Sequence, residues 1–255
     1  MPTIHYERQG RIVLITLQGD TDLNLGCVGR ELHERLLEYR DDDELWCAIV
    51  TGAGERAFSA GADLKATARR GGFGGNFWAA RTLDLLSGVE FWKPIVAAVN
   101  GYALGAGMML ALGCDVRLCS DNASFGLPEV KYGFPPGMGA TQRLPRAMPL
   151  GPALEILLTG DRISAEQAYH WGLVNKVVPL AELPGEALRL AERIAANPPL
   201  AVRATKELAL RGFDVTLEQG LRLESLLSHI ARQTEDAKEG PRAFAERRPP
   251  QFKGR

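Results

Sequence analysis

Three stretches rich in glycine and alanine stand out as places where the backbone could come close to a ligand. They are AFSAGADL at residues 57–64, NGYALGAGMMLALGCD at residues 100–115 and SFGLPEVKYGFPPGMGATQRL at residues 124–144. Small residues permit tight turns and leave main-chain amides open to a bound molecule. Each stretch then runs into a helical or apolar segment, which would hold the turn in place.

The second stretch could supply an anion site. A helix that begins at Gly105 would offer unpaired amides and the positive end of its dipole. If the amide of Ala106 meets a second amide from the turn at 59–61, the two could stabilise a carbonyl oxygen that gains negative charge. Glycine-rich turns before helices also serve close packing, and this alternative stays open.

Glu129 is the best candidate for a base beside such a site. It follows Pro128 in the otherwise apolar stretch 123–132. Burial there would raise the pKa of the carboxyl group and tune it for proton transfer near neutrality. The alternative is a solvated loop glutamate. Met109 comes three residues after Ala106, so it should lie on the same helical face and look into the same pocket.

Other common catalytic signatures are missing from the sequence. The chain has no GxGxxG, Walker, HExxH or GxSxG pattern, which argues against dinucleotide, nucleotide, zinc-protease and α/β-hydrolase sites. The histidines are scattered, and the spacing of the cysteines matches no zinc or CxxC pattern. The sequence therefore predicts no metal site. The cysteines are expected to be reduced, buried thiols: Cys27, Cys47, Cys114 and Cys119.

Charge and hydropathy exclude several classes of partner. Lys and Arg number 30 against 31 Asp and Glu, so nothing global favours nucleic acid or an anionic membrane. The N-terminus is polar before its apolar run, which is typical of a hairpin and not of a signal peptide, and we expect a cytoplasmic protein. The apolar run 94–113 is interrupted by Asn100 and several glycines, which predicts buried core and no membrane span.

Strands and helices are expected to alternate in the first part of the chain. The predicted strands are 4–7, 11–17, 46–54, 94–99 and 115–119, and the predicted helices are 27–39 and 105–112. The glycine-rich segment 65–76 is expected to be a loop that could gate a pocket or lie slack on the surface. Repeated β and α units in one core imply an α/β layered fold.

The later part of the chain is predicted to be mostly helical. The expected helices are 152–158, 165–171, 183–196, 200–211 and 217–234, with a short strand at 173–178. The break Asn197-Pro198-Pro199 is the best candidate boundary between an α/β core, residues 1–196, and a helical C-terminal part, residues 197–255. The last of these helices has a wide apolar face, which must pack on the core or on another subunit.

The three stretches resemble the signatures of the crotonase (enoyl-CoA hydratase/isomerase) superfamily. The motifs are 57–64, 100–107 and 125–129 continued by 141–144, and the resemblance runs over nearly the whole chain. It implies a crotonase-like (ClpP/crotonase) spiral core, in which repeated ββα units form two roughly perpendicular sheets. It also implies a C-terminal helical trimerisation region and a homotrimer or a homohexamer built as a dimer of trimers.

The resemblance further implies an acyl-CoA thioester as substrate, with coenzyme A as part of the substrate and no separate cofactor. The oxyanion amides would belong to Ala60 and Ala106, and the base would be Glu129. The substrate and its CoA would be bound by residues of the first signature and by three residues elsewhere: Ala57, Ala60, Ala62, Asp63, Leu64, Met109, Phe244 and Arg247. The last two would reach CoA in the same or a neighbouring subunit.

Met109 departs from the hydratase pattern of this superfamily. Hydratases resembling this chain have one glutamate at the position of Met109 and a second at the position of Glu129. A single carboxylate that moves a proton between two carbons favours enoyl-CoA double-bond isomerisation. The alternatives are a hydratase or dehydratase (lyase) that uses an additional, unidentified group, for which residues 65–80 are the candidate segment, or a non-catalytic acyl-CoA-binding subunit.

Overall fold

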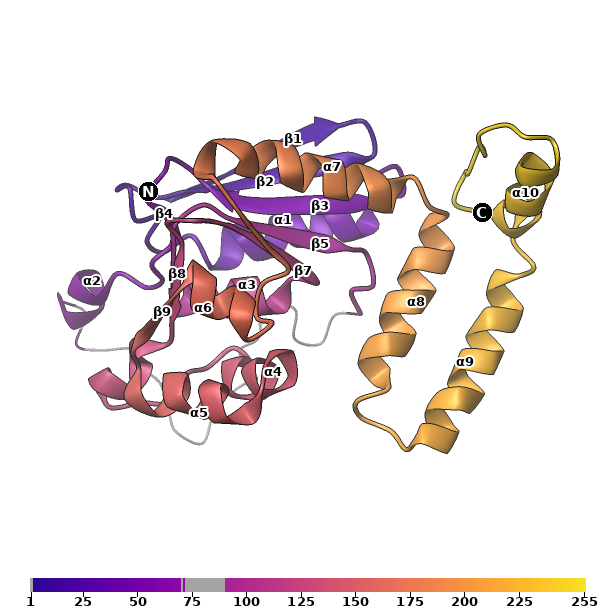
Figure 1. Ribbon diagram of the computed structural model, residues 1–255. Helices are drawn as coiled ribbons and strands as arrows, with labels where there is room; N and C mark the ends of the chain where they lie inside the picture. The colour runs from indigo at the N-terminus through magenta and orange to yellow at the C-terminus, as the bar shows by residue number, and fades with distance from the viewer. Residues whose placement is uncertain (1, 70, 72–89) are drawn as a thin grey trace.

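Successive turns of strand, strand and helix form the body of the protein (Figure 1). The structure, a computed structural model, describes residues 2–69, 71 and 90–255. One turn comprises β3 (Cys47–Gly52), β4 (Ala57–Ser59) and α2 (Leu64–Arg69). The next comprises β5 (Ile95–Val99), β6 (Tyr102–Leu104) and α3 (Ala106–Gly113). A further turn begins with β7 (Val116–Ser120) and β8 (Ser124–Gly126) and continues through η2 (Pro128–Tyr132) to α4 (Ala140–Ala147). These repeats confirm the predicted spiral core of ββα units.

Each turn gives its first strand to sheet A and its second strand to sheet B. Sheet A has the order β1-β2-β3-β5-β7-β10, with β1 (Thr3–Gln9), β2 (Ile12–Gln18) and β10 (Lys176–Val178). The pair β1 and β2 forms the predicted antiparallel hairpin, and the other pairs of sheet A are parallel. Sheet B has the order β4-β6-β8-β9, and β9 (Arg162–Ser164) runs antiparallel to β8.

Alternate residues of sheet A enter two separate hydrophobic layers, as expected for a sheet covered on both faces. On one face, Val13 and Val50 join a cluster with residues of α1 (Arg30–Asp41) and α3. On the other face, Ile12 and Ile49 join a cluster with residues of α7 (Leu183–Ala195). Helix α7 crosses β2, β3, β5 and β7, and Figure 1 shows it lying along the sheet.

The remaining helices follow the predicted helical character of the later chain. They are α5 (Leu150–Thr159), α6 (Ala165–His170), η3 (Leu180–Glu182), α8 (Pro199–Arg211), α9 (Leu217–Ala231) and α10 (Glu235–Ala245). Helices α8 and α9 stand away from the sheets as a pair (Figure 1). Within the described part of the chain, α8 buries Pro199 alone and α9 buries no side chain. The domain boundary at residue 196 stays a prediction.

The C-terminal tail returns to the core after α10. Arg11 donates from Nη2 to the carbonyl of Phe252 at 2.9 Å, and the ring of Phe252 packs against the α7 layer. The carboxylate of Asp236, on α10, accepts from the amides of Lys253 at 2.7 Å and Gly254 at 2.8 Å. These contacts fix α10 relative to sheet A.

Two sequence-based expectations are refined by the structure. The segment 65–76 was predicted to be a loop, but α2 occupies its first residues, and residues 70 and 72–76 lie outside the described residues. The apolar run 94–113 is divided among β5, β6 and α3, which are largely buried. In the ranges that the structure describes, no helix is long and apolar enough to cross a membrane.

Buried asparagine side chains join the repeats to one another. Asn100, at the end of β5, is 5% exposed. Its Nδ2 donates to the carbonyls of Gly52 at 3.0 Å, Gly54 at 2.7 Å and Ala57 at 3.3 Å. Its Oδ1 accepts from the amide of Gly52 at 3.0 Å. One side chain therefore satisfies the backbone at the crossing from sheet A to sheet B.

Replacing Asn100 with alanine should destabilise the protein strongly. The variant leaves buried backbone groups without partners, and we expect the free energy of unfolding to fall by about 3 kcal/mol. Asn122→Ala is the control, because its exposed amide donates to Glu55 O at 3.2 Å; the expected loss is under about 1 kcal/mol. Urea denaturation at one protein concentration measures both. Equal losses in the two variants would contradict the role of Asn100.

Candidate active site

The turn after β4 and the start of α3 meet with backbone against backbone. A Cβ atom on Gly61, whose φ is +88°, would lie 2.8 Å from Leu104 O and 3.1 Å from Ala106 N. A Cβ atom on Gly107 would lie 2.0 Å from Ser59 O. No side chain larger than hydrogen fits at either position, so the glycines are required by this contact. The first two glycine-rich stretches therefore come together, as a site built from two amides requires.

The amide of Ala106 is open at this meeting point. Ala106 is the first residue of α3, and the helical hydrogen bonds begin with Met109 N, which donates to Gly105 O at 2.9 Å. Amides in the first turn of a helix have no partner within the helix, and they lie at the positive end of its dipole. Ala106 can therefore donate to an anionic oxygen.

The second amide is not that of Ala60. Ala60 N donates to Leu23 O at 2.9 Å, and Gly61 N donates to Ser59 Oγ at 3.2 Å. An amide has one hydrogen to donate, so this geometry corrects the prediction that Ala60 supplies the second amide. Among the residues that the structure describes, Ala62 N has no acceptor, and Ala62 is exposed. The amide of Ala62 is therefore the available donor of the turn.

Glu129 is buried in the short helix η2, which excludes the solvated-loop alternative. The residue is 9% exposed, and its Oε2 atom is buried without a hydrogen-bond partner among the described residues. This burial raises the pKa of Glu129 above its ordinary value of 4.5. A carboxyl group with a raised pKa and a free oxygen is suited to accept and return a proton.

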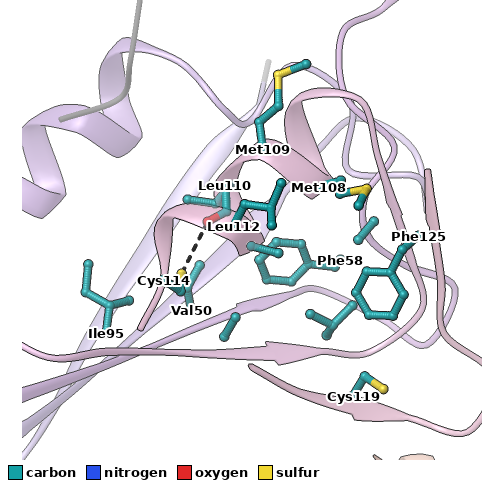
Figure 2. Close-up of a cluster of buried hydrophobic side chains, with 14 of the residues drawn as sticks. Val50, Phe58, Ile95, Met108, Met109, Leu110, Leu112, Cys114, Cys119 and Phe125 are labelled. Carbon is teal, nitrogen blue, oxygen red and sulfur yellow. Dashed lines mark hydrogen bonds between the residues drawn. The ribbon is translucent and has the colours of Figure 1, made fainter. Parts of the chain in front are cut away.

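The carboxyl group of Glu129 lies against the first turn of α3. A Cβ atom on Gly105 would be 2.7 Å from Glu129 Oε1. Gly105 is the N-cap of α3, and Met109 N donates to its carbonyl at 2.9 Å, so Met109 belongs to the first turn of the helix. Figure 2 shows Met109 directed away from Phe58 and Phe125, which lie in the core beneath the helix. The carboxyl group of Glu129 therefore lies at the start of α3, next to the residue that carries the Ala106 amide.

The predicted CoA-binding residues of the first signature differ in accessibility. Ala57 is 0% exposed, and its carbonyl accepts from Asn24 Nδ2 at 2.7 Å, so the prediction that it contacts a ligand does not fit. Asp63 caps α2, because its Oδ1 accepts from Ala66 N at 2.9 Å. Leu64 is 37% exposed and open to a ligand.

Phe244 and Arg247 are not brought near Glu129 within one chain. Phe244, on α10, is 86% exposed. Arg247 follows the helix in a left-handed backbone conformation, with φ +54°. Figure 1 shows α10 beside α8 and α9, on the side of the molecule opposite to α2. A role of these residues at the site would require a neighbouring subunit.

Sequence reasoning missed the residues that hold the turn after β4. Asn24 is 1% exposed and Ser59 is 0% exposed, and both bond to the backbone around this turn. Asn24 lies in a loop, where no periodicity marks a residue as buried. Ser59 lies inside a motif, but a serine among small residues gives no sign of what its hydroxyl binds.

A cleft of about 700 Å³ lies elsewhere, between sheet A and α7. It is lined mainly by apolar residues, including Leu14, Ile49 and Leu188. Glu55 at its edge is exposed, and neither Glu129 nor Ala106 reaches this cleft. The groups suited to proton transfer and anion binding are therefore on α3 and η2, and not in this cleft.

The cysteines are free and buried, as predicted: Cys27, Cys47, Cys114 and Cys119. Burial raises the pKa of the Cys114 thiol to about 12, which makes it unreactive near neutrality. In the described parts of the chain, no group of three or more His, Cys, Asp or Glu side chains could hold a metal ion. The expected absence of a metal site stays a prediction.

Known proteins resemble this chain over most of its length. The family model described as "Enoyl-CoA hydratase/isomerase" matches residues 7–255. The carnitinyl-CoA dehydratase of Proteus mirabilis (strain HI4320) is 44% identical over 229 residues, which are 88% of each chain. The (E)-benzylidenesuccinyl-CoA hydratase of Thauera aromatica is 44% identical over 224 residues, again 88% of each chain.

Solved structures agree with these sequence relatives. The enoyl-CoA hydratase from Mycobacterium tuberculosis H37Rv has a TM-score of 0.90 and 37% identity, and the match covers 100% of both chains. The enoyl-CoA hydratase from Bacillus anthracis has a TM-score of 0.89 and 38% identity, with 99% of both chains covered. The family match, the relatives and the fold together mean that the chain belongs to the enoyl-CoA hydratase/isomerase family, in the crotonase superfamily that its three glycine-rich stretches predicted.

Proposed function

We propose that this enzyme adds water across the α,β double bond of an enoyl-CoA thioester and, in the reverse direction, forms that double bond by removing water from a 3-hydroxyacyl-CoA. The observation that carries the proposal is the buried carboxyl of Glu129 beside the start of α3, whose Oε2 atom has no hydrogen-bond partner in the described part of the chain. The open amides of Ala62 and Ala106 support an enolate intermediate. The names of the relatives, a dehydratase and a hydratase, support this reaction over double-bond isomerisation.

The dehydration would proceed in two proton transfers. The thioester oxygen accepts from the two amides, and the Glu129 carboxylate removes a proton from the α carbon of a 3-hydroxyacyl-CoA. The electron pair left on carbon moves to the thioester oxygen and forms an enolate, which the amides stabilise. The enolate then collapses and expels the 3-hydroxyl group, which takes the same proton from Glu129 and leaves as water. Hydration follows these steps in reverse.

Because Met109 cannot transfer a proton, this mechanism uses Glu129 as its single carboxyl group. A thioether has no proton to exchange, so Glu129 must act first as base and then as acid. The same residue set can also move a proton between two carbons, and double-bond isomerisation is therefore the second candidate. Most of the segment 65–80, where we expected a possible additional group, lies outside the described residues.

We propose that the α8–α9 pair is covered by further copies of the chain in a homotrimer or homohexamer. Large apolar side chains are exposed along the pair: Leu210, Phe213, Leu217, Leu221, Leu226 and Ile230. Contiguous apolar surface of this kind marks an interface. In such an assembly Phe244 and Arg247 could reach CoA held by a neighbour, where a guanidinium suits phosphate.

Replacing Glu129 with glutamine should abolish most of the turnover. Glutamine has the same size but cannot accept a proton, so we expect kcat to fall at least about a hundredfold. Hydration of crotonyl-CoA and isomerisation of a 3-enoyl-CoA should be followed in parallel. Glu155→Gln, on the exposed surface of α5, is the control. Unchanged turnover in the Glu129 variant would contradict the base assignment, and a wild type that binds but never turns over would support a non-catalytic subunit.

The pH profile should report the raised pKa of Glu129. The base must be ionised in the free enzyme, so kcat/KM should fall on the acid side with an apparent pKa above the ordinary 4.5. The residual activity of Glu129→Gln should lack this acid limb. An acid limb at or below pH 4.5 in the wild type would argue that a solvated carboxyl group, and not Glu129, is the base.

Charge on the outer face of α9 should break the assembly. Leu226 and Ile230 are 55% and 61% exposed and lie one helical turn apart. Sedimentation velocity of the wild type should give a multiple of 27.7 kDa, whereas the double variant Leu226→Asp, Ile230→Asp should sediment as a single chain. Ser225→Asp on the same helix should keep the wild-type mass. A monomeric wild type would overturn the oligomer proposal.

A further inference from the structure

The hydroxyl of Ser59 joins two segments that are far apart in the sequence. Ser59 ends β4 and is 0% exposed. Its Oγ donates to the carbonyl of Asn24 at 2.9 Å and accepts from the amide of Gly61 at 3.2 Å. The hydroxyl therefore uses both its donor and an acceptor site, and it ties the turn after β4 to the loop that contains Asn24.

Other hydrogen bonds hold the same turn on the same side. Ala60 N donates to Leu23 O, and Gly26 N donates to Gly61 O, both at 2.9 Å. Together with the Ser59 hydroxyl, they occupy the amides of Ala60 and Gly61. The next amide along the turn, that of Ala62, is left open and its direction is set by the two peptide groups before it.

Ser59 also touches the helix that provides the other amide. A Cβ atom on Gly107 would lie 3.0 Å from Ser59 Cβ and 2.0 Å from Ser59 O. The backbone of Ser59 therefore packs directly against the first turn of α3, next to Ala106. A single residue thus contacts both amide-bearing segments, and its side chain bonds to one of them.

We propose that Ser59 is a positioning residue, whose hydroxyl fixes the amides of Ala62 and Ala106 at the separation that a thioester oxygen needs. The inference rests on the proposed function of this site. Ser59 is fully buried, so its side chain is closed off from a bound substrate. Loss of the hydroxyl frees the Gly61 amide and leaves the buried Asn24 carbonyl without this donor. The turn can then rotate, and the Ala62 amide no longer points at the thioester oxygen.

A matched control exists in the same sheet. Ser124, on β8 of sheet B, has a buried Oγ atom that makes no hydrogen bond to any residue in the described ranges. Ser124→Ala removes the same hydroxyl group from the same sheet without breaking a hydrogen bond to the turn. A difference between Ser59→Ala and Ser124→Ala therefore isolates the bonds that Ser59 makes.

The test uses butyryl-CoA, a saturated thioester with α protons but no double bond. Exchange of its α protons in D₂O measures enolate formation whether the enzyme hydrates or isomerises. When the thioester carbonyl is labelled with ¹³C, the infrared stretching frequency of this carbonyl in the bound ligand measures how strongly the amides polarise the C=O bond. The exchange rate, the stretching frequency and the dissociation constant of butyryl-CoA are all measured for the full-length wild type and for each serine variant.

For Ser59→Ala we expect α-proton exchange to slow about tenfold to a hundredfold, which is less than the loss of an entire oxyanion donor. On binding to Ser59→Ala, the carbonyl stretch of butyryl-CoA should shift by less than half as much as it does on binding to the wild type. The dissociation constant of butyryl-CoA should change by less than about threefold. Ser124→Ala should match the wild type in all three. Ser59→Cys, whose thiol is a weak donor and acceptor, should restore part of the stretch shift.

A wild-type carbonyl shift and exchange rate in Ser59→Ala, with binding intact, would overturn the inference. If Ser59→Ala does not fold, a full wild-type shift in Ser59→Cys would overturn it equally, because the weaker thiol bond should reduce the shift. Failure of the wild-type protein to bind butyryl-CoA or exchange its protons would instead remove the proposed function itself. The two failures are therefore distinguishable.

Discussion

The contact between the turn after β4 and the first turn of α3 is the constraint on which the site depends. Gly61 and Gly107 allow the two backbones to approach until a single methyl group would collide with a carbonyl. This approach brings amides from successive ββα turns to one place, although about forty residues separate them in the chain. The spiral makes such a meeting possible, because each turn of the chain places its short second strand beside that of the previous turn in sheet B.

The buried polar groups around this contact divide into two kinds. Asn24, Asn100 and Ser59 are buried with their hydrogen bonds made, and they hold the backbone where the chain passes from sheet A to sheet B. Glu129 is buried with one oxygen that no described residue pairs. An unpaired buried carboxyl group is costly for folding, and its persistence beside two open amides is typical of a site where a substrate supplies the missing partner.

The arm formed by α8 and α9 presents the opposite situation, since its apolar side chains are exposed. Leu217 and Ile230 on α9 contact water in the isolated chain, although Asp236 ties the tail to α10 and Arg11 ties the tail to the core. A protein that anchors both ends of an arm and leaves its apolar face open favours association with copies of itself. The same assembly would explain why Phe244 is exposed so far from Glu129.

The sequence by itself determined the α/β alternation, the hairpin, the helical later chain and the family, because hydrophobic periodicity and three ordered motifs are local properties. The motifs implied a second sheet, but periodicity did not locate its strands, because three-residue strands such as Ala57–Ser59 are too short to show a period. The sequence placed Glu129 and Ala106 at the site, but it chose Ala60 as the second amide donor. The amide of Ala60 donates to the carbonyl of Leu23, and no local sequence pattern predicts that these two residues are close. Only the tertiary structure decides which amides remain open, because an amide donates its one hydrogen to whichever carbonyl the fold brings close to it.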